Sequence, residues 1–452
     1  MADRSRRANR PQRPMRLALW IAALLMLGAA LPVLAAVSSG RDCGAARAYR
    51  NGIATWLGVG SPCRNAEPAL VQVKAGAVER AGASAVGDIS PPQAIRTPPT
   101  GPEPAIPSEF PIASQIEPAW RDGVAGAAPP SAAPDVVGAF RFVCTPSHLS
   151  YDDPVVYPGQ PGASHLHQWF GNTEAGAHST YESLRRTGRS TCMNPLNRSA
   201  YWMPAMLDGS GHVVRPDYVT VYYKRRPASD PECRRLAAKG CAPIPRGLRY
   251  VFGYDMVTHK PANGGVYFDC DGPGAVRGRF NTIAEAAKGC PSSARLGAVI
   301  NAPECWDGKR LDSANHRDHM ASPGYGDWGY QKCPSSHPYA IPAFTMGAWF
   351  TVGAGGADAW YLSSDEMPGK PRMPGGSTFH ADWFGAWDDA TMATWTAHCI
   401  DRMLNCSGGN LGNGTQLRQT GPFAWNAEPR LAPIPKRPAS GSSPHGHAVS
   451  GH

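Results

Sequence analysis

Short apolar stretches separated by turn residues dominate the chain between residues 135 and 426. Five of them are rich in β-branched and aromatic residues, which is typical of strands, and they lie at 140–144, 218–223, 248–254, 265–270 and 339–350. Helical patterns are fewer and shorter, at 177–186, 282–290 and 388–400, and Asp388 is a suitable cap for the last one. Strands outnumber helices without alternating with them. The pattern therefore predicts a mainly β domain, sandwich or jelly-roll-like, with a few short helices and long loops.

The N-terminal part of the chain has the pattern of an export signal. Residues 1–16 contain six arginines, and the apolar run at 17–37 ends in small residues. Such a run is either a cleaved signal peptide or a single transmembrane anchor. In both cases we expect residues 1–16 to stay in the cytoplasm and the rest to be exported, so the protein is secreted or membrane-anchored.

The composition divides the rest of the chain into a globular part and flexible flanks. Residues 64–134 are rich in Pro, Ala and Gly and predict a linker, preceded by a small Cys-bounded segment at 38–63. We assign 135–426 to one globular domain and 427–452 to a disordered tail.

Charge and motifs exclude several function classes. The net charge of +9 comes mostly from the two ends of the chain, so the domain lacks the basic stripe of a nucleic-acid binder. There is no Walker A or GxGxxG motif for a nucleotide, no GxSxG elbow and no HExxH pair. We therefore expect neither nucleic acid nor nucleotide as a partner.

The twelve cysteines agree with export. An even number without a CxxC pair predicts disulfides in an oxidising compartment rather than a zinc site. The full pairing does not follow from the sequence. Close spacing suggests three local pairs, which are Cys43 with Cys63, Cys233 with Cys241, and Cys399 with Cys406.

Histidines recur in polar, loop-like motifs and could hold one divalent metal ion of unknown identity. On a strand, the two histidines of an HxH pair point to the same face and can reach one ion, with further ligands from a distant segment. The candidate ligands are His165, His167, His316, His319 and His337. The alternatives are a metal-free function and hydrogen bonding within polar loops.

Acid–base chemistry is a second hypothesis. A pair of carboxylates, or a carboxylate with a histidine, cleaves glycosidic bonds in many hydrolases. The candidate catalytic residues are Asp153, Asp307, Asp382 and His380, with Asp307 or Asp382 as the base if a metal is present. For each aspartate, a turn or a helix cap is the simpler explanation. The candidate sugar platforms are Trp169, Trp202, Trp306, Trp383 and Tyr201, although a buried tryptophan is the commoner case.

Several long motifs between about residues 140 and 400 point to a known family. They include SHLHQWFGN (164–172), CWDGKRLDSANHRDHM (305–320), CPSSHP (333–338) and FHADWFGAWDD (379–389). Together they resemble the secreted domain of unknown function numbered nineteen ninety-six, an uncharacterised domain found with WSC and cellulose-binding modules. The resemblance implies no established activity. It implies a set of positions in these motifs, and we hypothesise that their histidines share one site. At that site we expect the domain to act on polysaccharide, as a hydrolase or lyase. The alternatives are a non-catalytic module that binds cell-wall glycan and a purely structural envelope protein.

Overall fold

The computed structural model describes residues 101–438, except 122–123, 127, 263–264, 326–329, 368, 421–425 and 427. The apolar segment 17–37, the cysteines at 43 and 63 and most of the predicted linker therefore lie outside the described residues. Within the described ranges, no helix has the length and apolarity to span a membrane.

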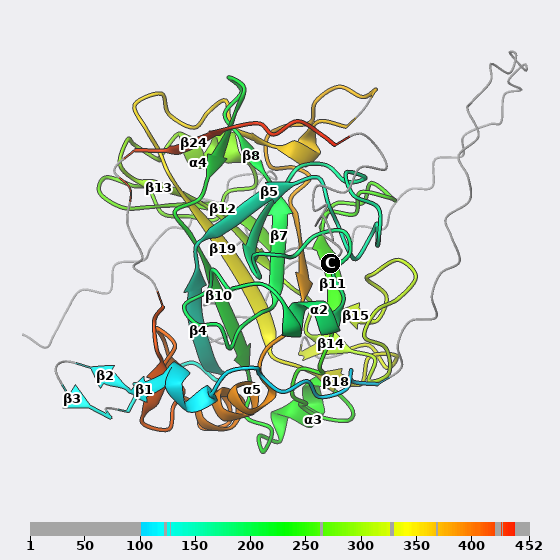
Figure 1. Cartoon of the computed structure of the whole chain (residues 1–452), viewed down its shortest axis with the longest axis vertical. Coiled ribbons are helices and arrows are strands. Elements are labelled where there is room, and N and C mark those ends of the chain that lie inside the picture. Colours follow the sequence, from blue (N-terminus) through cyan, green and yellow to red (C-terminus); the bar gives the residue numbers. More distant parts are fainter. Residues whose placement is uncertain are drawn as a thin grey trace, which may run out of the picture. The chain divides into compact units, whose positions relative to one another are not determined.

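Two antiparallel sheets form the body of the domain (Figure 1). The first sheet has the strand order β12 (Val266–Asp271), β13 (Arg295–Asn301), β19 (Ala343–Thr351), β10 (Tyr218–Arg225), β4 (Gly138–Cys144) and β22 (Asn405–Cys406), of which only β22 runs parallel to its neighbour. The second has the order β11 (Arg249–Gly253), β21 (His380–Phe384), β7 (Ala200–Pro204), β6 (His167–Gly171) and β5 (Pro146–Ser150).

The core lies between these sheets, so the fold is a sandwich. Burial alternates along β10, which turns Val221 and Tyr223 inward as expected for a strand with one covered face. Across the interface, the ring of Phe344 lies 5.7 Å from that of Tyr201 and 5.6 Å from that of Phe252, measured between centroids. The prediction of a mainly β, sandwich-like domain is thus confirmed.

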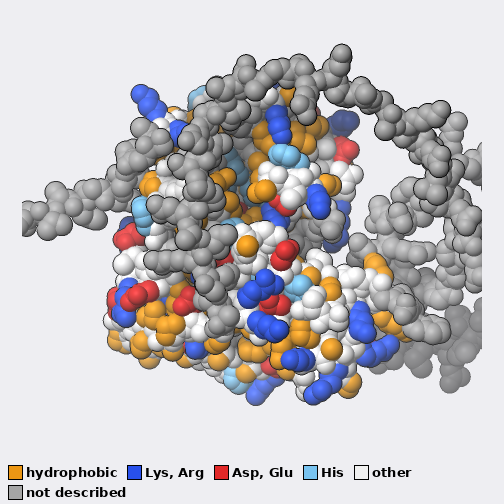
Figure 2. Space-filling view, turned by 90° about the vertical axis from the view of Figure 1, so that its right-hand side faces the viewer, with side chains coloured by type: hydrophobic (Ala, Val, Ile, Leu, Met, Phe, Trp, Pro, Cys, Tyr) orange, Lys and Arg blue, Asp and Glu red, His pale blue; other side chains and the backbone are white. Residues whose placement is uncertain are grey.

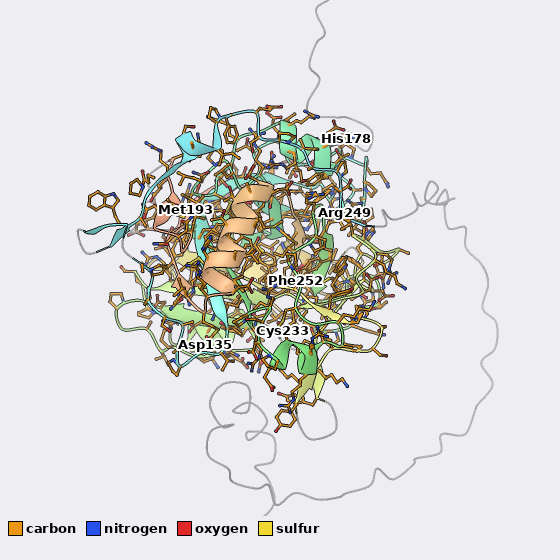
Figure 3. All side chains as sticks on the ribbon, turned by 90° about the horizontal axis from the view of Figure 1, so that it is seen from below. Asp135, His178, Met193, Cys233, Arg249 and Phe252 are labelled. Atoms are coloured by element: carbon orange, nitrogen blue, oxygen red, sulfur yellow. A yellow bond between two sulfur atoms is a disulfide. The ribbon has the colours of Figure 1, made fainter. Side chains whose placement is uncertain are left out.

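Short helices cover the ends of the sandwich. They are η3 (Ile112–Gln115), α2 (Tyr181–Arg186), α3 (Glu232–Leu236), α4 (Ile283–Ala287), η4 (Ser363–Asp365), α5 (Asp389–Trp395) and the π-turn η5 (Thr396–Ile400). The Asp388 carboxylate caps α5 by accepting the Thr391 backbone N–H. Seen from below, α5 crosses the centre of the molecule (Figure 3), where its buried Trp395 stacks on Phe140. The three helices predicted from sequence all exist, but two are shorter than expected.

Smaller sheets complete the described structure. Their strands are β1 (Ile116–Pro118) with β23 (Thr415–Leu417), β2 (Trp120–Arg121) with β3 (Val124–Ala125), β14 (Cys305–Trp306) with β15 (Met320–Ala321) and β18 (Tyr339–Ala340), β16 (Gly324–Tyr325) with β17 (Gln331–Lys332), and β20 (Tyr361–Leu362) with β8 (Met206–Leu207), β9 (His212–Arg215) and β24 (Arg430–Pro433). The single strand predicted at 339–350 is wrong, because Pro342 cannot donate to a sheet and separates β18 from β19.

Residues on both flanks of the predicted domain also pack on the sandwich. β1 belongs to the segment predicted as a linker, and the Asn194 side chain donates to the backbone oxygen of Gln115 at 2.8 Å. β24 belongs to the predicted tail and pairs with β9. The folded unit therefore includes residues beyond 135–426 at both ends.

Five disulfides join cysteines of the described part. They are Cys144–Cys192, Cys233–Cys241, Cys270–Cys290, Cys305–Cys333 and Cys399–Cys406. The two local pairs predicted within this part are confirmed.

Candidate functional site

The outer face of the second sheet carries the candidate site. Its central strands β6, β7 and β21 are buried at every position, so both of their faces are covered. Because side chains alternate along a strand, His380 and Asp382 share one face of β21. The register places Trp202 and Val251 on either side of Asp382. His167 shares the same outer face at the start of β6, beside Trp169.

This outer face has an apolar half and a polar half. The apolar half packs under α2 and the N-terminal segment, and it contains Ile106, Val155, Trp169, Tyr181, Leu184, Trp202 and Phe384. The polar half begins where the histidines stand. The apolar cover makes the site part of the protein interior, which raises the cost of any unpaired charge there.

The loop between β5 and β6 folds over the polar half. The backbone oxygen of Asp152 accepts a hydrogen bond from Nδ1 of His167 at 3.0 Å. The Asp153 carboxylate accepts the backbone N–H groups of Val155 and Val156, and its other oxygen lies 3.4 Å from the Trp202 indole nitrogen. These contacts hold Asp152 and Asp153 against the sheet.

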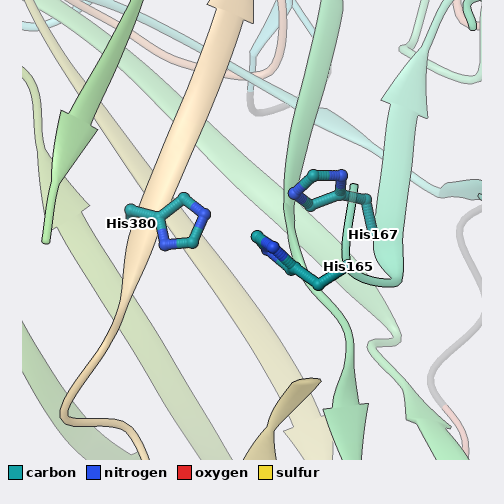
Figure 4. Close-up of side chains that lie close together, drawn as sticks. All are labelled: His165, His167 and His380. Atoms are coloured by element: carbon teal, nitrogen blue, oxygen red, sulfur yellow. The ribbon is translucent and has the colours of Figure 1, made fainter. Parts of the chain in front are cut away.

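Three histidine rings converge on one point (Figure 4). One ring nitrogen from each of His165, His167 and His380 lies within 4.8 Å of the other two. The ring centroids of His165 and His167 are 4.3 Å apart, and those of His165 and His380 are 5.0 Å apart. His165 comes from the loop, and the other two come from β6 and β21. This spacing is compatible with three ligands of a single metal ion.

Hydrogen bonds set the chemical form of two of these rings. Nδ1 of His380 donates to the backbone oxygen of Thr378 at 2.8 Å, as Nδ1 of His167 does to Asp152. A carbonyl oxygen only accepts, so both rings carry their proton on Nδ1 and present a lone pair on Nε2. Nε2 of His165 and of His167 is buried and has no hydrogen-bond partner in the described structure. Metal-bound histidines are usually oriented in this way.

Burial keeps the three rings neutral. It lowers the pKa of His167 to about 3 and that of His380 to about 4, and the nearby His380 adds to the effect on His167. Burial also holds the pKa of His165 well below its usual value, with smaller contributions from His167 and His380. Neutral imidazole is the form that binds metal ions.

Two buried carboxylates stand next to the histidines. Ligand atoms of Asp153, His167 and Asp382 also lie within 4.8 Å of one another. Burial raises the pKa of Asp153 to about 6, although the Val155 and Val156 N–H groups oppose this. Burial raises the pKa of Asp382 well above its usual value, and the charge of Asp153 raises it further.

The loop after β14 brings a residue that the sequence analysis missed. Its His316 accepts the Val251 backbone N–H with its carbonyl oxygen, which fastens the loop to the edge strand β11. Arg317 then donates to the backbone oxygens of Gly253 and Tyr254, and its charge acts on both Asp382 and His380. In the sequence, only the position of Arg317 between His316 and His319 could have indicated that it lies near the site.

The other predicted histidine ligands make different contacts. Both nitrogens of His319 are engaged, with the Ser313 hydroxyl and the Arg249 backbone oxygen. Nδ1 of His316 donates to Asp312, so this ring lies beside a carboxylate of its own loop. His337 is hydrogen-bonded to Ser336 and to the backbone oxygen of Asp318. None of the three belongs to the potential metal-binding groups of the described residues.

Asp307, a predicted base, stabilises a turn through hydrogen bonds of its carboxylate. Its carboxylate accepts the Lys309 and Arg310 backbone N–H groups and pairs with the Arg310 guanidinium at 2.7 Å. This set of contacts explains why its pKa is lowered despite burial, and it ties the carboxylate to the turn at Gly308.

The predicted sugar platforms are mostly interior side chains. Trp169, Trp202, Trp383 and Tyr201 are at most 1% exposed. The centroids of Trp169 and Trp202 lie 4.6 Å apart in a stacked pair under the apolar cover. Trp306 is partly exposed, and its indole N–H donates to the Arg310 backbone oxygen. Buried rings offer no face to a sugar in solution.

Of the three histidines, His165 is partly exposed as a residue, whereas its Nε2 is buried. The face in Figure 2 has histidine side chains near a central hollow, with basic, acidic and hydrophobic side chains mixed around it.

The geometry and the histidine motifs define a β-sandwich domain with a histidine–carboxylate cluster. The family model for a domain of unknown function, DUF1996, matches residues 153–387, and the chain belongs to this family. Searches of curated proteins and of solved structures found no match. The matched range contains all five clustered residues, and the expected family resemblance is confirmed.

Proposed function

We propose that this domain is a metal-dependent hydrolase that acts on polysaccharide outside the cytoplasm. The observation that carries the proposal is the convergence of His165, His167 and His380, whose available nitrogens lie within 4.8 Å of one another. Three neutral imidazoles are the protein donor set of some catalytic zinc sites. A divalent ion held there would act as a Lewis acid and lower the pKa of water.

The protein's own residues would supply binding and orientation. The backbone oxygens of Asp152 and Thr378 fix the two strand histidines, so little reorganisation is needed when an ion binds. The partly exposed side of His165 would face the substrate. Asp153 and Asp382 lie beside His167 on the buried side.

One observation favours this function over the glycan-binding alternative. A non-catalytic glycan-binding module needs exposed aromatic rings, but the predicted platforms Trp169, Trp202 and Trp383 are buried.

Export and the choice of polysaccharide rest on other support. Five disulfides in one domain suit an oxidising compartment. Polysaccharide is proposed because of the carbohydrate-associated modules expected in this family. Fractionation of cells that express the full chain tests export, because a cytoplasmic protein with free thiols would contradict it.

The metal is tested on the purified full chain. We expect close to one zinc per chain by elemental analysis, and we expect His380→Gln to reduce it by at least about tenfold. His178→Gln is the matched control, because His178 is exposed and lies outside the cluster. Zinc below about a tenth of stoichiometry in the wild type would refute the metal site.

The activity is tested with the zinc-loaded chain and a panel of polysaccharides, by measuring new reducing ends. We expect release from at least one polymer, loss of release after chelation, and the same loss in His380→Gln. Co-sedimentation with a polymer without any release would instead support the glycan-binding alternative.

A further inference from the structure

Asp382 is an unusual side chain for a protein interior. It is 1% exposed, and neither of its carboxylate oxygens has a hydrogen-bond partner among the described residues. A buried carboxylate without partners is strongly unfavourable, because it loses its hydration and gains nothing in return. The site must therefore supply Asp382 with a proton or a cation.

The nearest permanent positive charge does not neutralise it. Arg317 acts on Asp382 electrostatically, but its hydrogen bonds go to the backbone oxygens of Gly253 and Tyr254. On the other side lies Asp153, a second buried acid, which adds negative charge. Arg317 is thus one positive charge beside two carboxylates.

The two carboxylates are spaced for a shared ion. One oxygen of each lies within 4.8 Å of the other and of a His167 nitrogen. His167 has only Nε2 available for a metal ion, because its Nδ1–H donates a hydrogen bond to the backbone oxygen of Asp152. The single lone pair on Nε2 can coordinate one ion. If His167 is a ligand in the trihistidine group, the carboxylates are left to hold a separate ion.

We propose that Asp153 and Asp382 hold a second divalent cation, next to the ion of the trihistidine group. The chemistry of the donors indicates which ion: carboxylate oxygens prefer hard cations such as Mg²⁺, Mn²⁺ or Ca²⁺, whereas imidazoles suit zinc. The site would then be a mixed two-metal centre. This inference deepens the proposed function, and it names the metal chemistry of the same site.

The test uses Mn²⁺ as the probe on the full chain. The protein is stripped with a chelator, loaded with zinc and then titrated with Mn²⁺, with bound manganese measured by electron paramagnetic resonance. We expect one zinc and one manganese per chain. Asp382→Asn should weaken manganese binding by more than about 100-fold and retain zinc. The reason is that loss of a residue that only hydrogen-bonds to a metal ligand already lowers metal affinity by about 10- to 100-fold.

Controls separate this inference from the proposed function. Asp358→Asn removes an exposed carboxylate outside the cluster and should bind both ions like the wild type. Zinc without stoichiometric manganese in the wild type would overturn the second site and would mean that the carboxylates share a proton. Manganese that binds equally well to Asp382→Asn would also overturn it. If zinc does not bind, the trihistidine site is refuted, and the carboxylate site is then judged by whether Asp382→Asn weakens manganese binding. The wild-type result decides the question even if Asp382→Asn does not fold.

Discussion

The buried His319 should make the stability of the domain depend on pH. Its ring is 0% exposed, and its Nε2–H donates to the Arg249 backbone oxygen at 2.9 Å. Burial lowers its pKa from the usual 6.5 to about 4, and the charge of Arg310 adds to the lowering. The carboxylates of Asp312 and Asp307 and the hydrogen bond to Arg249 oppose it. The folded state therefore resists protonation of this histidine.

The size of the effect follows from the pKa difference. Between pH 6.5 and 4 the unfolded chain binds a proton at this position and the folded protein does not. The contribution of neutral His319 to the free energy of unfolding is therefore fully present above pH 6.5. It falls by about 1.4 kcal/mol for each unit that the pH drops below this value. Over this range His319 should remove about 3 kcal/mol of the free energy of unfolding.

The variant His319→Gln isolates this contribution. Glutamine retains a donor for the Arg249 oxygen but cannot take up a proton, so the variant lacks this part of the pH dependence. The assay is urea unfolding, followed by tryptophan fluorescence, with disulfides intact and chelator present. The wild type should be the more stable protein at pH 7.5, and its advantage should shrink by about 2–3 kcal/mol at pH 4.5. An advantage that stays constant with pH would refute the reasoning.

Three further predictions concern stability and use the same urea assay. Trp395→Ala should cost about 3–5 kcal/mol, because the ring is 0% exposed in the core, and a loss below about 1 kcal/mol would contradict this packing. Replacing Cys144 and Cys192 by Ala frees a span of 48 residues and should cost about 4 kcal/mol; equal stability of both forms would argue against the disulfide. Gly171→Ala should cost about 2 kcal/mol, because φ is +84° and a Cβ would meet the Ser199 backbone oxygen; an unchanged midpoint would exclude that clash.

The predicted strand β10 differs in its burial from the missed strands β6, β7 and β21. β10 has one covered face, so its apolar residues alternate and the pattern is visible. β6, β7 and β21 are buried on both faces, so their burial does not alternate. In β6 and β21, His167 and Asp382 also interrupt the continuous apolar run that is typical of such strands. These missed strands are the ones that carry the site, because a polar cluster can lie within the protein only where both faces are covered.

The histidines show the same limit. Six of them were candidates in polar motifs of similar appearance, but only His165, His167 and His380 have nitrogens that lie close to one another. His319 and His337 instead hold loops together through hydrogen bonds. Residue type and spacing do not distinguish a histidine of the cluster from one that stabilises a loop, since both roles need a polar ring near turns.

The sequence by itself determined what depends on near neighbours. The mainly β fold and the two local disulfides follow from patterns that span a few residues. Only the tertiary structure decided that β6 and β21 flank β7, and that the loop with Asp153 and His165 folds over them. The reason is physical: the register and the order of strands are set by packing between segments far apart in the chain, and a site built from such segments exists only after they have met.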